Sequence, residues 1–559
     1  MTATARLSID GEKIIFTGYS QELLQFYRSL PNSRFDRQNK LWTCLATPVS
    51  AWRTYGRSEF VSTMDDRLES LAEGFHARVL SSKRAAENAN YKQPPLRATD
   101  AWQHQIEAYW FAIALDSAML AMDMGTGKSK VAVDLSVNWG CSSVLIICPT
   151  SVRAVWRREF NRHSPVGWDV VILEKGTVAK RTEQAKAAKQ WGENNCRRVC
   201  IVINYESVWR SPFAAWALEE SWDCLILDES HRIKAHNSKV SNFCGRLGRR
   251  ADHRLCLTGT PMPHSPLDLF GQFKTLDPGV FGTGFGQFRQ RYAICQNPSI
   301  PQQITGHKNL DELHEKYNTL SFRVEAKDVL DLPPCTHDSR TFALSASART
   351  AYNELERELI TEVESGVVTV ANALVKLLRL QQITSGYLPA DDTKKEVSVD
   401  DGKANLLADL LADINEPVVV FCWFKHDLAK VSEVAEKLKR RYGELSGRRR
   451  DITDTATMSP DVDILAVQVK SGGIGIDLTR ARIAICYSLG CISPGDYDQM
   501  VARLVRPGQE RPVNFYHLIA DNTVDVSMYR AREARRNVID AVLEGFPPTE
   551  ECINDCFKT

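Results

Sequence analysis

The sequence lacks three features that would assign it to a narrow class: net charge, a long uninterrupted apolar run and closely paired cysteines. Its 70 lysines and arginines are balanced by 69 aspartates and glutamates, so the net charge of +1 neither indicates nor excludes a nucleic-acid partner. The long apolar stretch at residues 108–124 is interrupted by Asp116 and runs into a glycine loop. This pattern is typical of a helix followed by a buried strand, not of a membrane span.

The N-terminal residues contain no basic segment followed by an apolar one, so no secretion signal is predicted. The fifteen cysteines are scattered, and several lie in apolar runs, which is typical of buried thiols in a reducing compartment. The closest pairs, Cys196 with Cys200 and Cys552 with Cys556, lack C-x-x-C spacing, so no zinc site is predicted. We expect a soluble protein without a membrane partner, in the cytoplasm of a bacterial or phage-infected cell, or in the nucleus if it is eukaryotic.

The sequence does contain a candidate phosphate-binding loop at residues 121–129, Ala-Met-Asp-Met-Gly-Thr-Gly-Lys-Ser. Gly125 and Gly127 would let backbone N–H groups turn toward an anion, between a predicted strand and a predicted helix. Lys128 would reach the β- and γ-phosphates, and the Ser129 hydroxyl would bind Mg²⁺. Met122 replaces the first glycine of the usual G-x-x-x-x-G-K-[ST] pattern, and a plain strand–turn–helix junction is the alternative for this stretch alone.

Two short motifs follow apolar runs further along the chain. Asp228 and Glu229 come directly after the run 224–227, where a carboxylate beside a phosphate loop can hold Mg²⁺. We predict that Asp228 holds the metal through its water shell and that Glu229 is the general base for the attacking water. An exposed acidic loop is the alternative. The second motif, Leu-Thr-Gly-Thr-Pro at 257–261, also ends a short strand and could relay between the nucleotide site and a partner.

The last part of the chain holds two further motifs. Residues 471–479 contain three glycines, which allow the backbone to approach a phosphate closely. Within residues 499–509, Arg503 and Arg506 are three apart, so they would share one face of a helix. Aimed across a cleft, they would act as arginine fingers on the γ-phosphate. A solvated basic helix face is the alternative.

The hydrophobic pattern predicts an α/β protein with two similar halves. Apolar runs alternate with amphipathic segments in residues 96–276 and again in 401–526, as in parallel sheets buried on both faces. Residues 277–400 are predicted to form a helical insertion and a charged hinge. Residues 527–559 are predicted to form a C-terminal helix and tail.

A small α+β domain is predicted at residues 1–57, followed by a helical linker over 58–95. Phe35 and Trp42, with the interleaved Arg37, Lys40 and Arg53, could form a nucleic-acid-binding surface. The alternative is a packed appendage with Phe35 and Trp42 in its core.

Taken in order, these motifs resemble those of superfamily-two helicases, and within them the Swi/Snf-type double-stranded DNA translocases. The resemblance runs from about residue 96 to 525. Gln105 resembles the adenine-reading glutamine ahead of the loop, and Pro149-Thr150-Ser151 resembles the motif that contacts one DNA strand. Ser230 is similar to the residue found there in the annealing-helicase branch. The N-terminal domain resembles the HARP domain of annealing helicases.

Two positions depart from the pattern of the family. Pro263-His264 stands where the family usually has a Gln-Asn pair, and Ile492-Ser493-Pro494 stands where it usually has Trp-Asn-Pro. Both departures bear on contacts to DNA and leave the residues expected to hydrolyse ATP intact.

The resemblance implies two tandem RecA-like lobes of the P-loop NTPase type, with ATP and Mg²⁺ between them. The catalytic residues that it implies are Lys128, Asp228, Glu229, Arg503 and Arg506. The nucleotide-binding residues are Gln105, Met124, Gly125, Thr126, Gly127, Lys128, Ser129, Gly475 and Asp477, with Ser129 and Asp228 as the metal-binding pair. The DNA-binding residues are Thr150, Ser151, Arg153, Lys470, Ser471 and Gly472.

We therefore expect an ATP-dependent translocase that acts as a monomer on duplex, forked or branched DNA, independently of sequence, in fork remodelling, strand annealing or branch migration. A strand-separating DNA helicase would use the same core but would need a wedge that the sequence does not reveal. A non-catalytic DNA-binding regulator would tolerate loss of Lys128, Glu229 or the arginines, and all of them are present.

Overall fold

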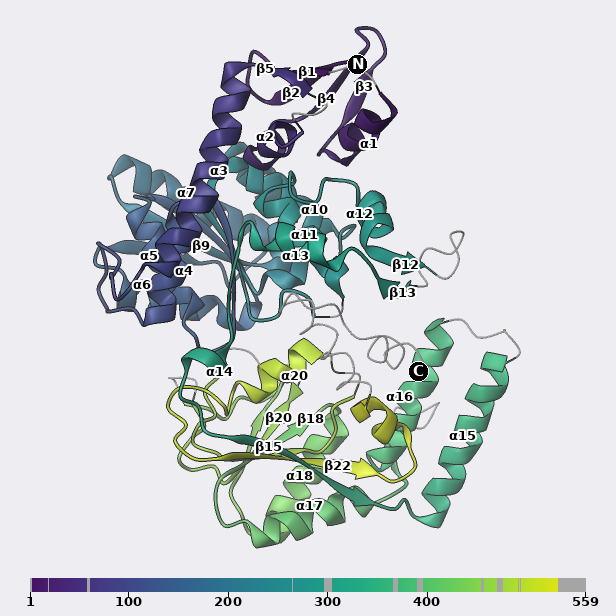
Figure 1. Ribbon diagram of the computed structural model, residues 1–559. Coiled ribbons are helices and arrows are strands. Elements are labelled where there is room, and N and C mark those ends of the chain that lie inside the picture. Colours follow the sequence, from purple (N-terminus) through teal and green to yellow (C-terminus); the bar gives the residue numbers. More distant parts are fainter. Residues whose placement is uncertain are drawn as a thin grey trace. The chain divides into compact units, whose positions relative to one another are not determined.

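The computed structural model of the protein describes residues 3–530, except 19, 58–60, 264, 296–303, 365–369, 390–395, 454–456, 470–475, 491 and 493. It divides into two compact units, one holding Met1–Val329 and the other beginning at Leu330 (Figure 1). None of the described helices combines the length and the apolar composition that crossing a bilayer requires.

A seven-stranded sheet forms the centre of the first unit, and all of its neighbouring strands run parallel. Its middle strands are apolar and buried along their length, as expected for a parallel sheet with helices packed on its faces. In spatial order the strands are β14 (Ser321–Val324), β6 (Ser117–Met122), β11 (Ala251–Thr258), β10 (Trp222–Asp228), β7 (Ser143–Cys148), β9 (Arg198–Asn204) and β8 (Trp168–Ile172).

The helices of this unit connect the strands or follow them. They are α4 (Gln103–Ile113), α5 (Lys128–Asn138), α6 (Arg153–His163), α7 (Val178–Asn194), α8 (Tyr205–Val208), α9 (Phe213–Glu219), α10 (Lys239–Leu247), α11 (Leu269–Leu276), α12 (Phe285–Tyr292), α13 (Leu310–Asn318) and α14 (Ala326–Val329). Short 3₁₀ turns are η1 (Thr150–Val152), η2 (Ser230–Ile233), η3 (Gly248–Arg250) and η4 (Pro266–Asp268), and β12 (Ala293–Cys295) pairs with β13 (Ile304–His307) as an antiparallel hairpin.

The sheet of the first unit extends beyond residue 276, where the sequence predicted the α/β region to end. Strand β14 pairs with β6, with Phe322 opposite Leu120. The strand is four residues long and includes Ser321 and Arg323, so it has no apolar run by which the sequence could reveal it.

The N-terminal residues form a small mixed sheet in the order β3-β4-β2-β1-β5. Strand β5 pairs with β1 in parallel, so this sheet continues past residue 57, the predicted end of the domain. Its elements are β1 (Ala3–Leu7), β2 (Lys13–Thr17), α1 (Gln21–Ser29), β3 (Arg34–Asp36), β4 (Leu41–Leu45), α2 (Pro48–Tyr55) and β5 (Val61–Met64).

A single long helix, α3 (Asp66–Glu87), joins the N-terminal sheet to the seven-stranded sheet (Figure 1). Leu68 and Ala72 on its first turns are buried in the core of the N-terminal sheet. Phe75 and Val79, further along the same helix, are buried in the core of the seven-stranded sheet. Because one rigid helix contributes to both cores, the two sheets of this unit are packed as one body.

The loop after α11 forms a second contact between these sheets. The carboxylate of Asp277 accepts hydrogen bonds from the N–H groups of Gly279 at 2.6 Å and of Val49 at 3.5 Å. Arg53 donates to the carbonyl of Gly279 at 2.8 Å and to the Ser29 hydroxyl at 2.7 Å. A Cβ atom at Gly279 would lie 2.4 Å from the Thr47 hydroxyl oxygen, so only glycine fits the approach.

The second unit has its own six-stranded parallel sheet, in the order β15-β22-β21-β18-β20-β19. The prediction of two similar α/β halves is therefore confirmed. Its strands are β15 (Cys335–Phe342), β18 (Val418–Cys422), β19 (Tyr442–Leu445), β20 (Ile464–Gln468), β21 (Ile483–Cys486) and β22 (Val513–Ala520), and a separate hairpin pairs β16 (Tyr387–Pro389) with β17 (Glu396–Ser398). Its helices are α15 (Ala346–Glu364), α16 (Val370–Thr384), α17 (Gly402–Asp413), α18 (Lys425–Lys437) and α20 (Pro494–Val501).

Alternate residues of strand β18 serve the two faces of this sheet. Val419 and Phe421 pack into one apolar cluster, whereas Val418 and Val420 pack into another. This period of two shows that both faces are covered, which is why the strand reads in the sequence as a continuous apolar run.

We expect that Arg53→Ala weakens the packing of the N-terminal sheet, because it leaves the Gly279 carbonyl and the Ser29 hydroxyl without this donor. The free energy of unfolding of the first unit should fall by about 2 kcal/mol, measured by thermal and urea denaturation. Arg37→Ala, at an exposed position of the same small domain, is the matched control. Equal stability of the two variants would contradict the role of Arg53.

Candidate functional site

Three loops leave the same edge of the seven-stranded sheet. Strands β6, β11 and β10 are neighbours and parallel, and the register places Ala121 opposite Thr258 and Leu257 opposite Asp228. Their carboxyl ends therefore meet. This edge is where open parallel sheets bind ligands, and all three loops carry residues that the sequence singled out.

The loop after β6 has the geometry of an anion-binding turn. Gly125 and Gly127 adopt left-handed backbone conformations, with φ angles of 83° and 85°. Gly127 is the residue before the first turn of α5, and within the described part of the chain no side chain caps that turn. Its backbone N–H groups thus remain available for a negatively charged group.

The side chain of Lys128 is directed back over this loop. Its ammonium group donates hydrogen bonds to the carbonyl oxygens of Met122 at 2.8 Å and of Asp123 at 3.2 Å. The Thr126 hydroxyl also donates to the Asp123 carbonyl, at 2.6 Å. The positive charge is thereby held beside the loop by neutral partners, which a phosphate group could replace with a charge-assisted contact. Met124 and Ser129 lie in the same turn and are partly exposed.

Gln105, on the first turn of α4, supports the loop from beneath. Its amide nitrogen Nε2 donates to the Thr126 carbonyl at 2.9 Å, and its Oε1 accepts from the Trp102 N–H at 3.0 Å. The His104 ring also contacts the Thr126 carbonyl, at 2.8 Å through Nε2. Both ends of the Gln105 amide are therefore engaged by the protein. Its predicted part in reading adenine stays a prediction.

Asp228 stands at the carboxyl end of β10. Its Oδ2 accepts a hydrogen bond from the Trp156 indole at 3.2 Å, and its carbonyl accepts one from the Tyr205 hydroxyl at 2.8 Å. Burial, together with the neighbouring Glu229 carboxylate, raises the pKa of Asp228 to about 7, and the charge of Lys128 opposes this rise. A cation at this position would favour the ionised form.

Glu229 follows in a conformation that is uncommon for a residue with a side chain. Its φ and ψ angles are both 53°, in the left-handed region, and it is 7% exposed. Its Oε2 lies 3.4 Å from Nδ1 of His231, and the same nitrogen lies 3.2 Å from the Thr258 hydroxyl. The imidazole therefore links the carboxylate after β10 to the end of β11.

The loop after β11 lies against the phosphate-binding turn. The Thr258 hydroxyl accepts a hydrogen bond from the Thr260 N–H at 3.1 Å. A Cβ atom built on Gly259 would lie 3.5 Å from the Met122 carbonyl oxygen and from the Met124 nitrogen. The three loops thus form one contiguous site, which the order of the motifs alone could not show.

The residues predicted to contact DNA in the first unit differ in exposure. Thr150 and Ser151 are exposed in η1, whereas Arg153 is buried. The guanidinium of Arg153 donates to the carbonyls of Leu173 at 2.7 Å and of Thr150 at 3.1 Å, so it braces the turn that carries the exposed hydroxyls.

In the second unit the described parts of the last two motifs pack together. Arg506 Nε lies 4.0 Å from Oδ2 of Asp477, and Arg506 also donates to the Ile476 carbonyl at 3.4 Å. Arg503 is 6% exposed, and its carbonyl accepts a hydrogen bond from the Leu478 N–H at 3.0 Å. The predicted residues Lys470, Ser471, Gly472 and Gly475 lie outside the described residues, and so does His264.

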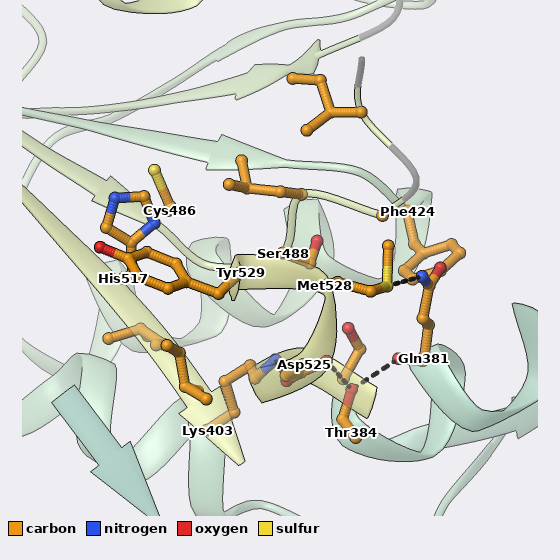
Figure 2. Close-up of a pocket in the computed structure, with 16 residues that line it drawn as sticks. Gln381, Thr384, Lys403, Phe424, Cys486, Ser488, His517, Asp525, Met528 and Tyr529 are labelled. Atoms are coloured by element: carbon orange, nitrogen blue, oxygen red, sulfur yellow. Dashed lines mark hydrogen bonds and ion pairs between the residues drawn. The ribbon is translucent and has the colours of Figure 1, made fainter. Parts of the chain in front are cut away.

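The second unit also contains a cavity of about 90 Å³ (Figure 2). The Thr384 hydroxyl donates to Asp525 at 2.9 Å, and the buried Lys403 lies 3.2 Å from the same carboxylate. Among the described residues that line it, none is predicted to bind nucleotide or DNA. The ion pair holds the chain after β22 to α17, and the Thr384 hydrogen bond holds it to α16, so we assign the cavity a structural role.

Comparison with known proteins supplies two family matches. The SNF2-related domain matches residues 94–386, and the helicase conserved C-terminal domain matches residues 402–508.

Two curated relatives share the same region. The chain is 23% identical over 568 residues to the Caenorhabditis elegans homologue of SWI/SNF-related matrix-associated actin-dependent regulator of chromatin subfamily A-like protein 1, covering 95% of this chain and 75% of that protein. It is 25% identical over 454 residues to the human DNA annealing helicase and endonuclease ZRANB3, covering 76% of this chain and 39% of that protein. Among solved structures, the Sulfolobus solfataricus SWI2/SNF2 ATPase core in complex with dsDNA aligns at 20% identity with a TM-score of 0.38, covering 83% of this chain and 98% of that one.

Gly127→Ala should weaken nucleotide binding, because a Cβ atom there would lie 2.2 Å from Nε2 of Gln105 and the left-handed φ of 85° disfavours a side chain. We expect the affinity for a fluorescent ATP analogue to fall at least about tenfold. Gly140→Ala is a matched control, because Gly140 has a similar φ of 74° with nothing within 4 Å of the added atom. If both variants bind the nucleotide equally well, the close contact with Gln105 has no part in binding.

Proposed function

The chain belongs to the SNF2-related family, and from this premise we propose that it uses ATP hydrolysis to move along duplex, forked or branched DNA. Membership confirms the resemblance seen in the sequence motifs and makes the protein a DNA-dependent ATP hydrolase of the Swi/Snf type. The observation that carries the proposal is the meeting of three loops at one edge of the first sheet. They bring a lysine, two carboxylates and a glycine-formed anion site together.

We propose that ATP binds with its phosphates on the turn at Gly125–Lys128. The backbone N–H groups at the start of α5 would receive the phosphate oxygens, and Lys128 would exchange its two carbonyl partners for them. The Ser129 hydroxyl and the Asp228 carboxylate are oxygen donors of the kind that Mg²⁺ prefers, so these residues would hold it. When bound, Mg²⁺ neutralises charge on the phosphates.

Glu229 is the proposed general base. It would orient the attacking water and accept its proton at a carboxylate oxygen. Two features support this role: Glu229 is next to Asp228, and it is buried. His231 contacts both Glu229 and Thr258, so it would hold the carboxylate in place. Arg503 and Arg506 are proposed to stabilise the charge that develops on the γ-phosphate.

DNA would be held mainly through its phosphates. In the first unit the exposed Thr150 and Ser151 are proposed contacts, and in the second unit Lys470, Ser471 and Gly472 are proposed from the motif alone. Such binding is independent of sequence and weakens as salt concentration rises.

A preference for forks or branches is proposed to come from the N-terminal sheet. Phe35 is 47% exposed, its ring centroid lies 5.5 Å from that of Trp42, and Arg34, Arg37 and Lys40 are exposed around them. Trp42 is half-buried against the core of this sheet, so Phe35 is the exposed ring, and an exposed ring among cations suits the stacking of an unpaired base. Arg53 belongs instead to the contact with Gly279.

Lys128→Ala and Glu229→Gln are each expected to lower ATP hydrolysis at least about a hundredfold, since one removes phosphate stabilisation and the other removes the base. Phosphate-release assays would measure the rate, and circular dichroism would check the fold. Glu229→Gln should still bind ATP. Hydrolysis at the unaltered rate by either variant would refute the assigned site.

Arg506→Ala should lower the rate of ATP hydrolysis at least about tenfold, while leaving the affinity of the protein for the nucleotide within about twofold. The rate is measured with saturating DNA and the affinity by titration of a fluorescent ATP analogue. Arg449, which is exposed in the same unit, supplies the control variant Arg449→Ala. An Arg506→Ala protein with an unchanged rate would rule out the proposed role.

The nature of the DNA is tested by comparing ATPase rates with single-stranded, duplex and forked DNA and with RNA. We expect duplex or forked DNA to stimulate most and the stimulation to weaken as salt rises. Stimulation by RNA alone would overturn the proposal. If Phe35→Ala responds to forked DNA as the unaltered protein does, the N-terminal sheet is not the source of the preference.

A further inference from the structure

We propose that Gln272, in helix α11, is a positioning residue for ATP hydrolysis, which holds the turn containing Glu229 at a set place against the loop after β11. The inference rests on the proposed role of Glu229 as general base. It assigns a function to a residue outside every motif singled out in the sequence.

The first contact is to the residue that follows Glu229. The hydroxyl of Ser230 donates a hydrogen bond to Oε1 of Gln272 at 2.7 Å. Both side chains are fully buried, each with 0% exposure. A hydrogen bond shielded from water in this way is costly to break, because neither partner can turn to solvent instead.

The second contact is to the loop after β11. Nε2 of Gln272 donates to the carbonyl of Pro261 in that loop at 2.7 Å, and also to the carbonyl of Asp268, the residue before α11, at 3.0 Å. Only the amide nitrogen can face two carbonyl oxygens, which settles the orientation of the side chain. One buried amide therefore connects the turn after β10 with the loop after β11, at Pro261, the residue that follows Thr260.

The neighbouring residue makes the same junction tight. A Cβ atom built on Gly271 would lie 2.0 Å from the carbonyl oxygen of Ile233, at the end of η2. Helix α11 thus lies directly against the backbone of the turn that begins at Ser230. Gly271 permits the approach, and Gln272 supplies the hydrogen bonds at the place of contact.

Glu229 needs such support because its own backbone does not favour the observed conformation. A glutamate at φ 53° is in a sparsely populated region, so surrounding contacts must hold it there. Those contacts are the Ser230 hydroxyl on one side and His231 with Thr258 on the other. Loss of the first would let the turn relax and move the carboxylate away from the attacking water.

We expect Gln272→Met, which keeps the size of the side chain and removes all three hydrogen bonds, to lower kcat about ten- to a hundredfold, as displacement of a reacting group does. The affinity for ATP should change less than about twofold, because the phosphate-binding turn is held by Gln105. Ser230→Ala should lower kcat in the same sense. The double variant should be no slower than Gln272→Met, since the Ser230–Gln272 hydrogen bond that Ser230→Ala removes is already absent in Gln272→Met.

Gln287→Met replaces an exposed glutamine on the nearby helix α12 and is the matched control. Stopped-flow phosphate release gives kcat, and fluorescent-nucleotide titration gives the affinity, both measured on the 559-residue chain with duplex DNA. An unaltered kcat in Gln272→Met would overturn the inference, and so would parallel losses of kcat and affinity, which would indicate general damage to the site. If Gln272→Met does not fold, Ser230→Ala decides: reduced kcat with intact affinity supports the inference, and unchanged kcat overturns it.

Glu229→Gln separates this inference from the function on which it rests. If Glu229→Gln hydrolyses ATP normally, the proposed general base is wrong, whatever Gln272 does. If Glu229→Gln is inactive while Gln272→Met is fully active, the base stands and the positioning role of Gln272 is refuted.

Discussion

The parallel pairing of β6, β11 and β10 is the constraint on which the first unit depends. Because these strands are neighbours and point the same way, Met122, Thr258 and Asp228 reach one edge of the sheet together. Residues more than a hundred positions apart in the sequence thereby form one site. The apolar side chains of these strands are buried, which stabilises the sheet and keeps its edge rigid. The polar groups on the loops are therefore held in fixed positions.

Much of this could be predicted from the sequence, for a physical reason. Strands buried on both faces appear in the sequence as apolar runs, so the run 224–227 predicts β10 to within two residues at each end. A motif also depends only on neighbouring residues. A glycine in a tight turn, or a carboxylate after a strand, can therefore be recognised from a short stretch of sequence. The edge strands β14 and β15 lack such runs. Strand β15 has the polar sequence Cys-Thr-His-Asp-Ser-Arg-Thr-Phe, so the sequence does not predict it as a strand within the helical insertion.

What the sequence could not predict are contacts between distant segments. Gln272 contacts Ser230, 42 residues away, and nothing local distinguishes this glutamine from an exposed one. Arg153 shows the reverse case, because a cation in a DNA-contact motif is buried and bonded to backbone carbonyls. Gln105 likewise has its amide engaged by Trp102 and Thr126. For Arg153 and Gln105 the partners are backbone groups, and for Gln272 the partner is a side chain on another element, so each contact depends on the whole fold and not on a residue type that a motif could record.

Helix α11 is only eight residues long, yet its first half contacts the turn after β10 and the loop after β11. Its last residue precedes Asp277, which contacts the N-terminal domain through Val49. Asp277 is 3% exposed, and it is shielded from water partly by residues 47–49, at the start of helix α2. Cutting the chain before α3 would uncover this carboxylate together with the apolar seat around it. The N-terminal sheet is therefore an integral part of the first unit. A shortened protein would expose Asp277 and its apolar neighbours, so any change in its activity would combine this damage to the first unit with the loss of the N-terminal sheet itself.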